Sequence, residues 1–111
     1  MTTPYRSPAP PIGCSPEDEL AFLKHQRDST FKECCDVFMR AQAMGKAFMD
    51  MCEMKAAMLC AKVEHPKLLA LLDRMCREAA DAVVANYVHA MDLQREVDRL
   101  DAELKRWDFG R

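Results

Sequence analysis

The chain has 111 residues and a formal net charge of −2, with 16 basic and 18 acidic side chains. This length predicts a single domain, and the balanced charge excludes the basic surface on which non-specific nucleic-acid binding depends. Because the sequence has only three glycines, no run of β-branched residues and no stretch of about 18 uncharged apolar residues, it predicts an all-α fold without a membrane span.

Residues 1–14 are expected to form an extended, proline-rich arm. Four of the six prolines fall within residues 1–13, and such a segment does not pack a core by itself. The arm lacks the apolar region of a secretory signal and the arginine-rich pattern of a transit peptide, so the expected location is the cytoplasm or nucleus, with the mitochondrion left open. Ser7 and Ser15 each precede a proline, which is the dipeptide that proline-directed kinases modify.

A long helix is predicted from about residue 16 to residue 63, as the first arm of a hairpin that residues 15–111 are expected to form. Ser15 has the hydroxyl of a good N-cap, Pro16 suits the first helical position, and acidic residues follow in the first turn. The run at residues 24–30, KHQRDST, is polar on all sides, which predicts either a continuous helix or a slight kink there.

The stretch at residues 38–63 has more apolar surface than a single neighbour covers. At about 100° per residue, two apolar rows form on different sides of this helix. The row predicted to be the core stripe is centred on Cys52 and contains Phe38, Ala41, Gly45, Phe48, Met49, Cys52, Ala56, Leu59 and Val63. The second, methionine-rich row contains Met44, Ala47, Met51, Met54, Met58 and Ala61. A surface helix needs an apolar stripe of only about 100°, so this helix is expected to have two packing partners.

A turn at residues 64–66 and a second helix from about residue 67 to residue 107 complete the predicted antiparallel two-helix hairpin. Pro66 ends the first helix and suits the start of the next one, and so short a connection makes the two helices neighbours. The core stripe of the second helix is predicted to contain Leu68, Leu72, Met75, Ala79, Val83, Asn86, Ala90, Leu93, Val97, Leu100 and Leu104. Asn86 is interpreted as a residue that sets the register, because a polar side chain at a coiled-coil seam disfavours other alignments.

Two helices alone enclose little interior, so the hairpin is expected to be completed into a bundle by association with itself or with other protein chains. The second row supplies the predicted partner-binding residues, Met44, Met51, Met54 and Met58, because methionine adapts to varied apolar surfaces. The sequence has no glycine-rich phosphate loop and no Ser/His/Asp set. We therefore expect a non-enzymatic structural or assembly subunit of a larger protein complex, without a cofactor or a small-molecule substrate.

Six cysteines leave two alternative functions open. Cys52 and Cys76 lie at nearly the same height in an antiparallel hairpin, so they can form a disulfide if their Cα atoms come within about 7 Å. A hairpin that is stapled in this way, or that is redox-active, fits an oxidising compartment such as the mitochondrial intermembrane space. The second alternative is a copper carrier, because Met49 and Cys52 have the soft ligands that Cu(I) prefers. No metal site is assigned, because a helix points the neighbouring Met51 away from this pair.

Overall fold

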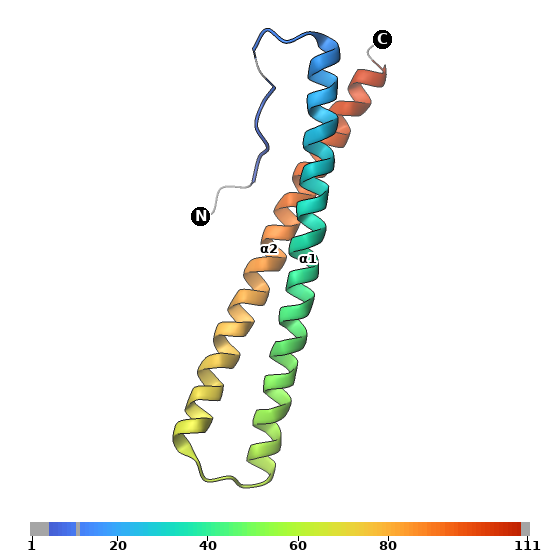
Figure 1. Cartoon of the computed structure of the whole chain (residues 1–111). Helices are drawn as coiled ribbons and strands as arrows, with labels where there is room; N and C mark the ends of the chain where they lie inside the picture. The colour runs from blue at the N-terminus through green and yellow to red at the C-terminus, as the bar shows by residue number, and fades with distance from the viewer. Residues whose placement is uncertain (1–4, 11, 110–111) are drawn as a thin grey trace. The chain divides into compact units, whose positions relative to one another are not determined.

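Two long helices make up the computed structural model, which describes residues 5–10 and 12–109 (Figure 1). Helix α1 comprises Pro16–Cys60 and helix α2 comprises Pro66–Phe109. The two helices contact each other through side chains in both halves of their length, and no strand occurs among the described residues. The predicted all-α helical hairpin is therefore confirmed. Residues 1–4 and 11 of the predicted arm, and residues 110–111, lie outside the described residues.

Helix α1 begins where the N-cap signal predicts. The Ser15 Oγ accepts a hydrogen bond from the Asp18 backbone N–H at 3.2 Å, and the Ser15 carbonyl accepts one from the Glu19 N–H at 2.9 Å. Pro16 occupies the first helical position, where a backbone N–H would have no partner in the helix. The polar run at residues 24–30 is helical throughout, so α1 continues through it without an interruption.

Helix α1 ends at Cys60, a few residues before the predicted end at about residue 63. Lys62 stops the helix, because its φ of 55° places it in the left-handed region. The Lys62 N–H donates to the Leu59 carbonyl at 3.1 Å, and the next N–H, that of Val63, donates to the Met58 carbonyl at 3.0 Å. These two bonds form a Schellman motif, which gives partners to the last carbonyls of the helix. A backbone conformation at a lysine thus ends the helix before the proline does.

Helix α2 begins at Pro66, after a connection of residues 61–65 that replaces the predicted turn at residues 64–66. His65 caps the helix, because its Nδ1 accepts a hydrogen bond from the Leu68 backbone N–H at 3.3 Å. The His65 carbonyl also accepts a hydrogen bond from the Leu69 N–H at 3.0 Å. Helix α2 continues to Phe109, slightly beyond the predicted end at about residue 107.

The helices meet along seams whose positions repeat every seven residues. The seam positions of α1 are Leu20, Leu23, Arg27, Thr30, Cys34, Val37, Ala41, Met44, Phe48, Met51, Lys55 and Met58. Those of α2 are Leu69, Leu72, Cys76, Ala79, Val83, Asn86, Ala90, Leu93, Val97, Leu100, Leu104 and Trp107. Every one of these residues is buried or half-buried. Because alternating steps of three and four residues keep one helix face toward a partner, this is the pattern of a two-stranded coiled coil.

The seam of α1 is rotated relative to the predicted core stripe, which is wrong for most of its members. The exposed members of that stripe are Phe38, Met49, Ala56, Leu59 and Val63. The half-buried seam residues Met44, Met51 and Met58 belong instead to the second row of the prediction. The physical reason is that both sides of α1 are apolar here, so the sequence period alone does not select the side that faces α2. The pairing with α2 selects the side that continues the row of Leu23 and Val37.

The predicted stripe of α2 is correct from Ala79 onward and at Leu72. Near the start of this helix, Leu69 and Cys76 lie on the seam, whereas the predicted Leu68 and Met75 are 38% and 41% exposed. Neighbouring leucines at the start of α2 make the period ambiguous there, and the pairing with α1 decides which of them is covered.

The chain forms two compact units, and both helices take part in each. The terminal unit comprises residues 1–37 and 88–111, and it contains a hydrophobic core. The buried apolar side chains of that core are Leu23, Cys34, Val37, Ala90, Leu93, Val97 and Leu100. An ion pair flanks them, in which Arg27 Nε donates to Asp101 Oδ1 at 2.9 Å. This hydrogen bond raises the pKa of Arg27.

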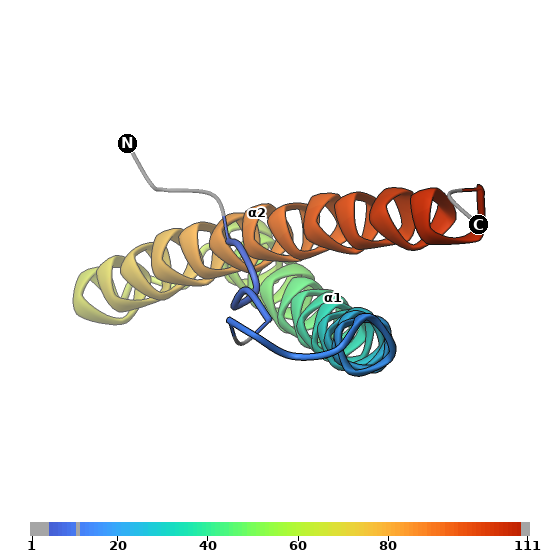
Figure 2. The same ribbon diagram turned by 90° about the horizontal axis from the view of Figure 1, so that it is seen from above.

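The N-terminal arm covers one side of the terminal unit's core. Tyr5 packs against the cluster that Cys34, Val37, Ala90 and Leu93 form. Ser7 is only 7% exposed, and its Oγ donates a hydrogen bond to Glu96 Oε1 at 2.9 Å. Figure 2 shows the arm turning back from the start of α1 toward α2. The sequence predicted an extended arm but not these contacts with the arm's own hairpin.

The turn unit, residues 38–87, has few fully buried apolar side chains. Within this described part of the chain, Ala41 and Leu72 are the only buried apolar side chains. The seam instead includes Lys55, which forms an ion pair with Asp73 of α2. A hydrogen bond from Lys55 to this carboxylate raises the pKa of the ammonium group.

Candidate partner-binding surface

The large apolar side chains that the structure leaves exposed gather mainly in the turn unit. Those in the turn unit are Phe38, Met39, Met49, Met54, Leu59, Val63, Leu68, Leu71, Met75, Val84 and Tyr87, whereas the terminal unit exposes Ile12, Phe31, Val88 and Met91. Single exposed apolar residues are normal on a protein surface, but a contiguous set is typical of an interaction site. Helix geometry places most of these side chains in two groups, one on each side of the seam.

On one side of the seam lies a surface that we call the aromatic flank, made of Phe38, Met49, Leu59, Val84 and Tyr87. Phe38 and Leu59 lie on one line along α1, because whole multiples of seven residues separate them, and Met49 lies beside this line. The Phe38 and Tyr87 rings connect the two helices, with centroids 5.7 Å apart and planes at 72°. This edge-to-face geometry is favourable for aromatic pairs.

Side chains of the aromatic flank are open to solvent along both helices. Met49 is 56% exposed, Leu59 is 55% exposed, and Val84, one turn before Tyr87 on α2, is 61% exposed. Gly45 lies on the same line of α1 as Phe38, and a Cβ atom there would meet nothing within 4 Å. The flank is therefore an uncovered apolar surface.

A second surface, which we call the methionine flank, lies on the other side of the seam and consists of Met54, Leu68, Leu71 and Met75. Leu68 and Met75 are seven residues apart on α2, and Leu71 lies on the helix face next to them. Met54 lies roughly 200° around α1 from Cys52, which places it on the side opposite to the aromatic flank. Met54 is 56% exposed, and the three α2 residues are each about two-fifths exposed.

The four methionines predicted to bind a partner do not share one surface. Met44, Met51 and Met58 are half-buried on the seam, whereas Met54 is exposed on the methionine flank. Met44 contacts α2 directly, because its Sδ accepts a hydrogen bond from Asn86 Nδ2 at 3.4 Å. The exposed apolar surface of α1 is thus mainly the row that the sequence analysis assigned to the core.

Asn86 lies half-buried on the seam, as the sequence pattern predicts. Its Nδ2 donates to the Ala82 carbonyl of its own helix at 2.8 Å, in addition to the Met44 sulfur. These contacts satisfy the amide nitrogen without a polar partner on α1. A role in setting the register remains a prediction.

The structure brings Cys52 and Cys76, the pair predicted to form a disulfide, into one open groove. The groove is lined by Phe48, Cys52, Lys55, Asp73, Cys76, Arg77 and Ala80. Both thiols are free. Burial raises the pKa of Cys76, and so do the charge of Cys52 and a hydrogen bond with it. Both thiols therefore line the same groove between the two helices.

Metal ligation by His, Cys, Asp and Glu has no candidate in the described part of the chain, where no group of three or more such side chains could hold an ion. The two residues considered for copper, Met49 and Cys52, both lie on the aromatic-flank side of α1, with Met49 56% exposed. None of the helices that the structure describes is both long and apolar enough to cross a membrane.

Comparison of the chain with protein-family models, with curated proteins and with solved structures finds no match in any of the three.

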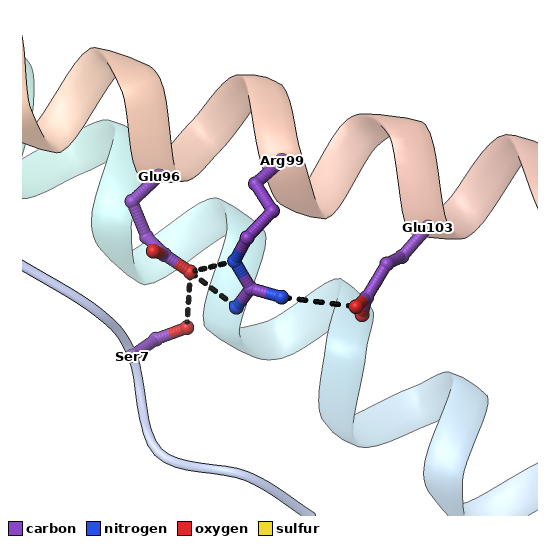
Figure 3. A network of polar contacts seen from close by, with 4 residues as sticks. All are labelled: Ser7, Glu96, Arg99 and Glu103. Atoms are coloured by element: carbon purple, nitrogen blue, oxygen red, sulfur yellow. Dashed lines mark hydrogen bonds and ion pairs between the residues drawn. The ribbon is translucent and has the colours of Figure 1, made fainter.

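Sequence reasoning missed one cluster of polar residues, which lies in the terminal unit (Figure 3). Glu96 is 3% exposed and accepts hydrogen bonds from Ser7 Oγ and Arg99 Nε, both at 2.9 Å. Arg99 also donates to Glu103 Oε1 at 2.9 Å. The only sequence signal for this cluster was a glutamate directly beside the seam residue Val97, a position where a coiled coil often has a charge that reaches solvent.

Proposed function

We propose that this protein is a non-enzymatic structural or assembly subunit whose turn unit binds helices of another protein chain through the aromatic flank. The observation that carries the proposal is the contrast inside this unit between two buried apolar residues, Ala41 and Leu72, and the many large apolar side chains that are exposed. A hairpin with so little interior gains stability when further helices cover its open apolar surface.

The shape of the aromatic flank supports a helix as the partner. Its members follow helical lines on α1 and α2, with aromatic and methionine side chains that fit between the residues of a third helix. Of the charged groups of the groove, Lys55 and Asp73 pair with each other, and Arg77 is exposed to solvent. The expected partner helix therefore has an apolar face with aliphatic side chains at three- and four-residue steps.

The experiment compares the native chain with the double variant Met49→Glu/Leu59→Glu. Both residues are more than half exposed, so the hairpin is expected to keep its helix content while the flank loses its apolar character. A matched control is Met39→Glu/Ala43→Glu, which adds the same charge to exposed positions on another side of α1. Light scattering measures the mass of each chain over a range of concentrations, circular dichroism measures helix content, and a dye that fluoresces on apolar surface reports uncovered flank.

If copies of the chain supply the partner helices, the native mass rises above 12.7 kDa with concentration. The Met49→Glu/Leu59→Glu variant then weakens association by at least about tenfold, since each glutamate must lose water at the interface, while the control variant associates normally. If another chain supplies the helices, the native chain stays monomeric and binds the dye, and only the flank variant loses that signal. Two results together would contradict the proposal. The native chain would be a fully helical monomer that binds no dye, and the Met49→Glu/Leu59→Glu variant would give the same mass and the same dye signal.

A second candidate function rests on the thiols of Cys52 and Cys76, which line one groove. We propose that these cysteines staple α1 to α2 when the chain is in an oxidising compartment. Mass spectrometry after alkylation, on protein purified without reductant, tests this function. A bridge between these two residues supports it, and six alkylated cysteines would reject it.

A further inference from the structure

Ser7 joins the arm to helix α2 through a polar contact with Glu96. Both residues are buried, at 7% and 3% exposure, and the Ser7 Oγ donates to Glu96 Oε1 at 2.9 Å (Figure 3). Burial of the Glu96 carboxyl group raises its pKa. Hydrogen bonds from Arg99 and Ser7 and the charge of Arg99 lower the pKa by more than burial raises it, so the pKa of Glu96 lies below its ordinary value. Glu96 is therefore a buried carboxylate at neutral pH, and it accepts a hydrogen bond from the Ser7 hydroxyl.

The charged groups that face Ser7 carry a net negative charge. Arg99 is shared between Glu96 and Glu103, so one guanidinium is set against two carboxylates. A negative charge added to Ser7 would face the Glu96 carboxylate, to which the Ser7 hydroxyl now donates a hydrogen bond. A buried anion next to a carboxylate is costly, because it has lost its water and is repelled by a like charge.

Ser7 and Pro8 also form the serine–proline dipeptide that proline-directed kinases modify. The described arm residues 5–10 form no regular secondary structure, and Arg6, Pro8 and Ala9 are exposed. A short segment with few buried contacts detaches locally at low free energy, without unfolding the helices. Such an opening presents Ser7 and Pro8 as an extended peptide.

We propose that Ser7 is a phosphorylation site for a proline-directed serine kinase, and that phosphorylation releases the arm from the terminal unit. In the transfer, the γ-phosphoryl group of a nucleoside triphosphate moves to Ser7 Oγ. The bond between the γ-phosphorus and its bridging oxygen breaks, the nucleoside diphosphate leaves, and the hydroxyl proton passes to the base of the kinase. The product has about two negative charges where Ser7 had a donor, so it cannot return to Glu96.

Release of the arm uncovers a defined part of the core. Tyr5 packs against the cluster that contains Cys34, which is 8% exposed and donates from Sγ to the Ala90 carbonyl at 3.4 Å. Burial raises the pKa of the Cys34 thiol, so alkylation of this residue is slow while the arm is in place. The next residue, Cys35, is exposed and provides an internal reference for reagent and pH.

The chain offers a matched control in its other serine–proline pair. Ser15 is exposed and caps α1 through its Oγ. A negative charge at a helix N-terminus is favourable, so a charge at Ser15 is not expected to move the arm. The variants Ser7→Glu and Ser15→Glu therefore place the same charge at two serine–proline sites with different surroundings.

The decisive sample is the full chain with phosphate on Ser7. The Gly13–Cys14 junction allows its synthesis, because a peptide thioester of residues 1–13 with phosphoserine can be ligated to residues 14–111, which begin with a cysteine. Iodoacetamide alkylation is then followed by mass spectrometry, and the ratio of the Cys34 rate to the Cys35 rate is the measured quantity. Circular dichroism checks that helix content is unchanged.

We expect the ratio to rise at least about tenfold in the phosphorylated chain, which corresponds to the loss of one charge-assisted hydrogen bond. Tyr5→Ala, which removes the packing without adding charge, gives the ratio for a released arm, and Ser15→Glu keeps the native ratio. An unchanged ratio in the phosphorylated chain would overturn the proposal, and so would a rise that accompanies loss of helix. Incubation with a proline-directed kinase and ATP completes the test: phosphate on Ser7 supports the proposal, and phosphate on Ser15 alone rejects it.

Discussion

The terminal unit and the turn unit are built from the same two helices with the same seven-residue seam, yet they differ in how well they bury it. The terminal unit has a core with Leu93 and Leu100 fully or almost fully buried. In the turn unit the corresponding seam includes three half-buried methionines, Lys55 and Asn86. Periodicity is therefore not what separates the two units.

The described part of the N-terminal arm covers the terminal unit and not the turn unit. In the terminal unit the arm lies over the core through Tyr5 and Ser7, and ion pairs such as Arg27 with Asp101 close its sides. The turn unit has no such cover among the described residues of the chain, and its flanks remain apolar. Two helices in contact leave most of each helix surface open, so a stable core requires a further layer. This comparison is the physical basis for proposing that another chain covers the aromatic flank.

The largest expected effect contrasts a buried leucine of the terminal unit with an exposed one of the turn unit. Leu93→Ala should lower the free energy of unfolding by about 2 to 5 kcal/mol, because Leu93 is 0% exposed and the substitution leaves a cavity. Leu59→Ala, at a residue that is 55% exposed, should change it by less than about 0.5 kcal/mol. Urea unfolding followed by circular dichroism measures both. Equal losses for the two variants would show that the units do not differ in burial.

Oxidation should strengthen the weaker unit. A disulfide between Cys52 and Cys76 closes the loop that contains the turn, which in the chain-entropy model stabilises the fold by about 3 kcal/mol. Treatment with oxidised glutathione, followed by urea unfolding, measures this gain, and the variant Cys76→Ser is the control that cannot form the bridge. If the oxidised native chain unfolds at the same urea concentration as the control, the two thiols are not placed for a bridge.

Replacement of Asn86 tests the polar residue in the turn unit's seam. Asn86→Leu should raise the free energy of unfolding by up to about 1 kcal/mol, because leucine packs better at a seam, and should relax the register of the helices. Cross-linking under oxidising conditions reports the register, since the native alignment pairs Cys52 with Cys76 alone. The register interpretation fails if the variant gives the same single cross-link as the native chain.

The smallest expected effect is the pH dependence of the arm contact in the terminal unit. The pKa of Glu96 is lowered in the folded chain, so its contribution to stability is complete above the ordinary glutamate pKa and is lost as the pH falls through the lowered value. Urea midpoints measured from neutral to acidic pH should therefore fall more steeply for the native chain than for Glu96→Gln. Parallel curves for the two chains would show that the contact with Ser7 and Arg99 does not depend on this charge.

Local signals in the sequence predicted the helices well. The hydroxyl of Ser15, Pro16 and the interruption at Pro66 act within one turn of the chain, and α1 and α2 begin where these residues place them. The end of α1 was predicted a few residues too late, because nothing in the sequence marks Lys62 for the left-handed region, which glycine usually occupies.

The sequence predicted an excess of apolar surface on α1 but not which of its two apolar rows is exposed. An excess of apolar residues on α1 is visible in the sequence and is present in the structure, yet the exposed row contains Phe38, Met49 and Leu59 rather than Met44, Met51 and Met58. When two neighbouring sides of a helix are both apolar, its own periodicity cannot say which of them faces the partner helix.

What the sequence by itself determined is the all-α hairpin, the starts of its helices and the surplus of apolar surface between residues 38 and 63. These features depend on capping, on proline and on periodicity, which act over a few residues. Only the tertiary structure decided which row became the seam and that the arm buries Ser7 against Glu96. Each of these depends on the pairing of segments far apart in the chain, where small differences in packing select one arrangement from several that the local pattern allows equally.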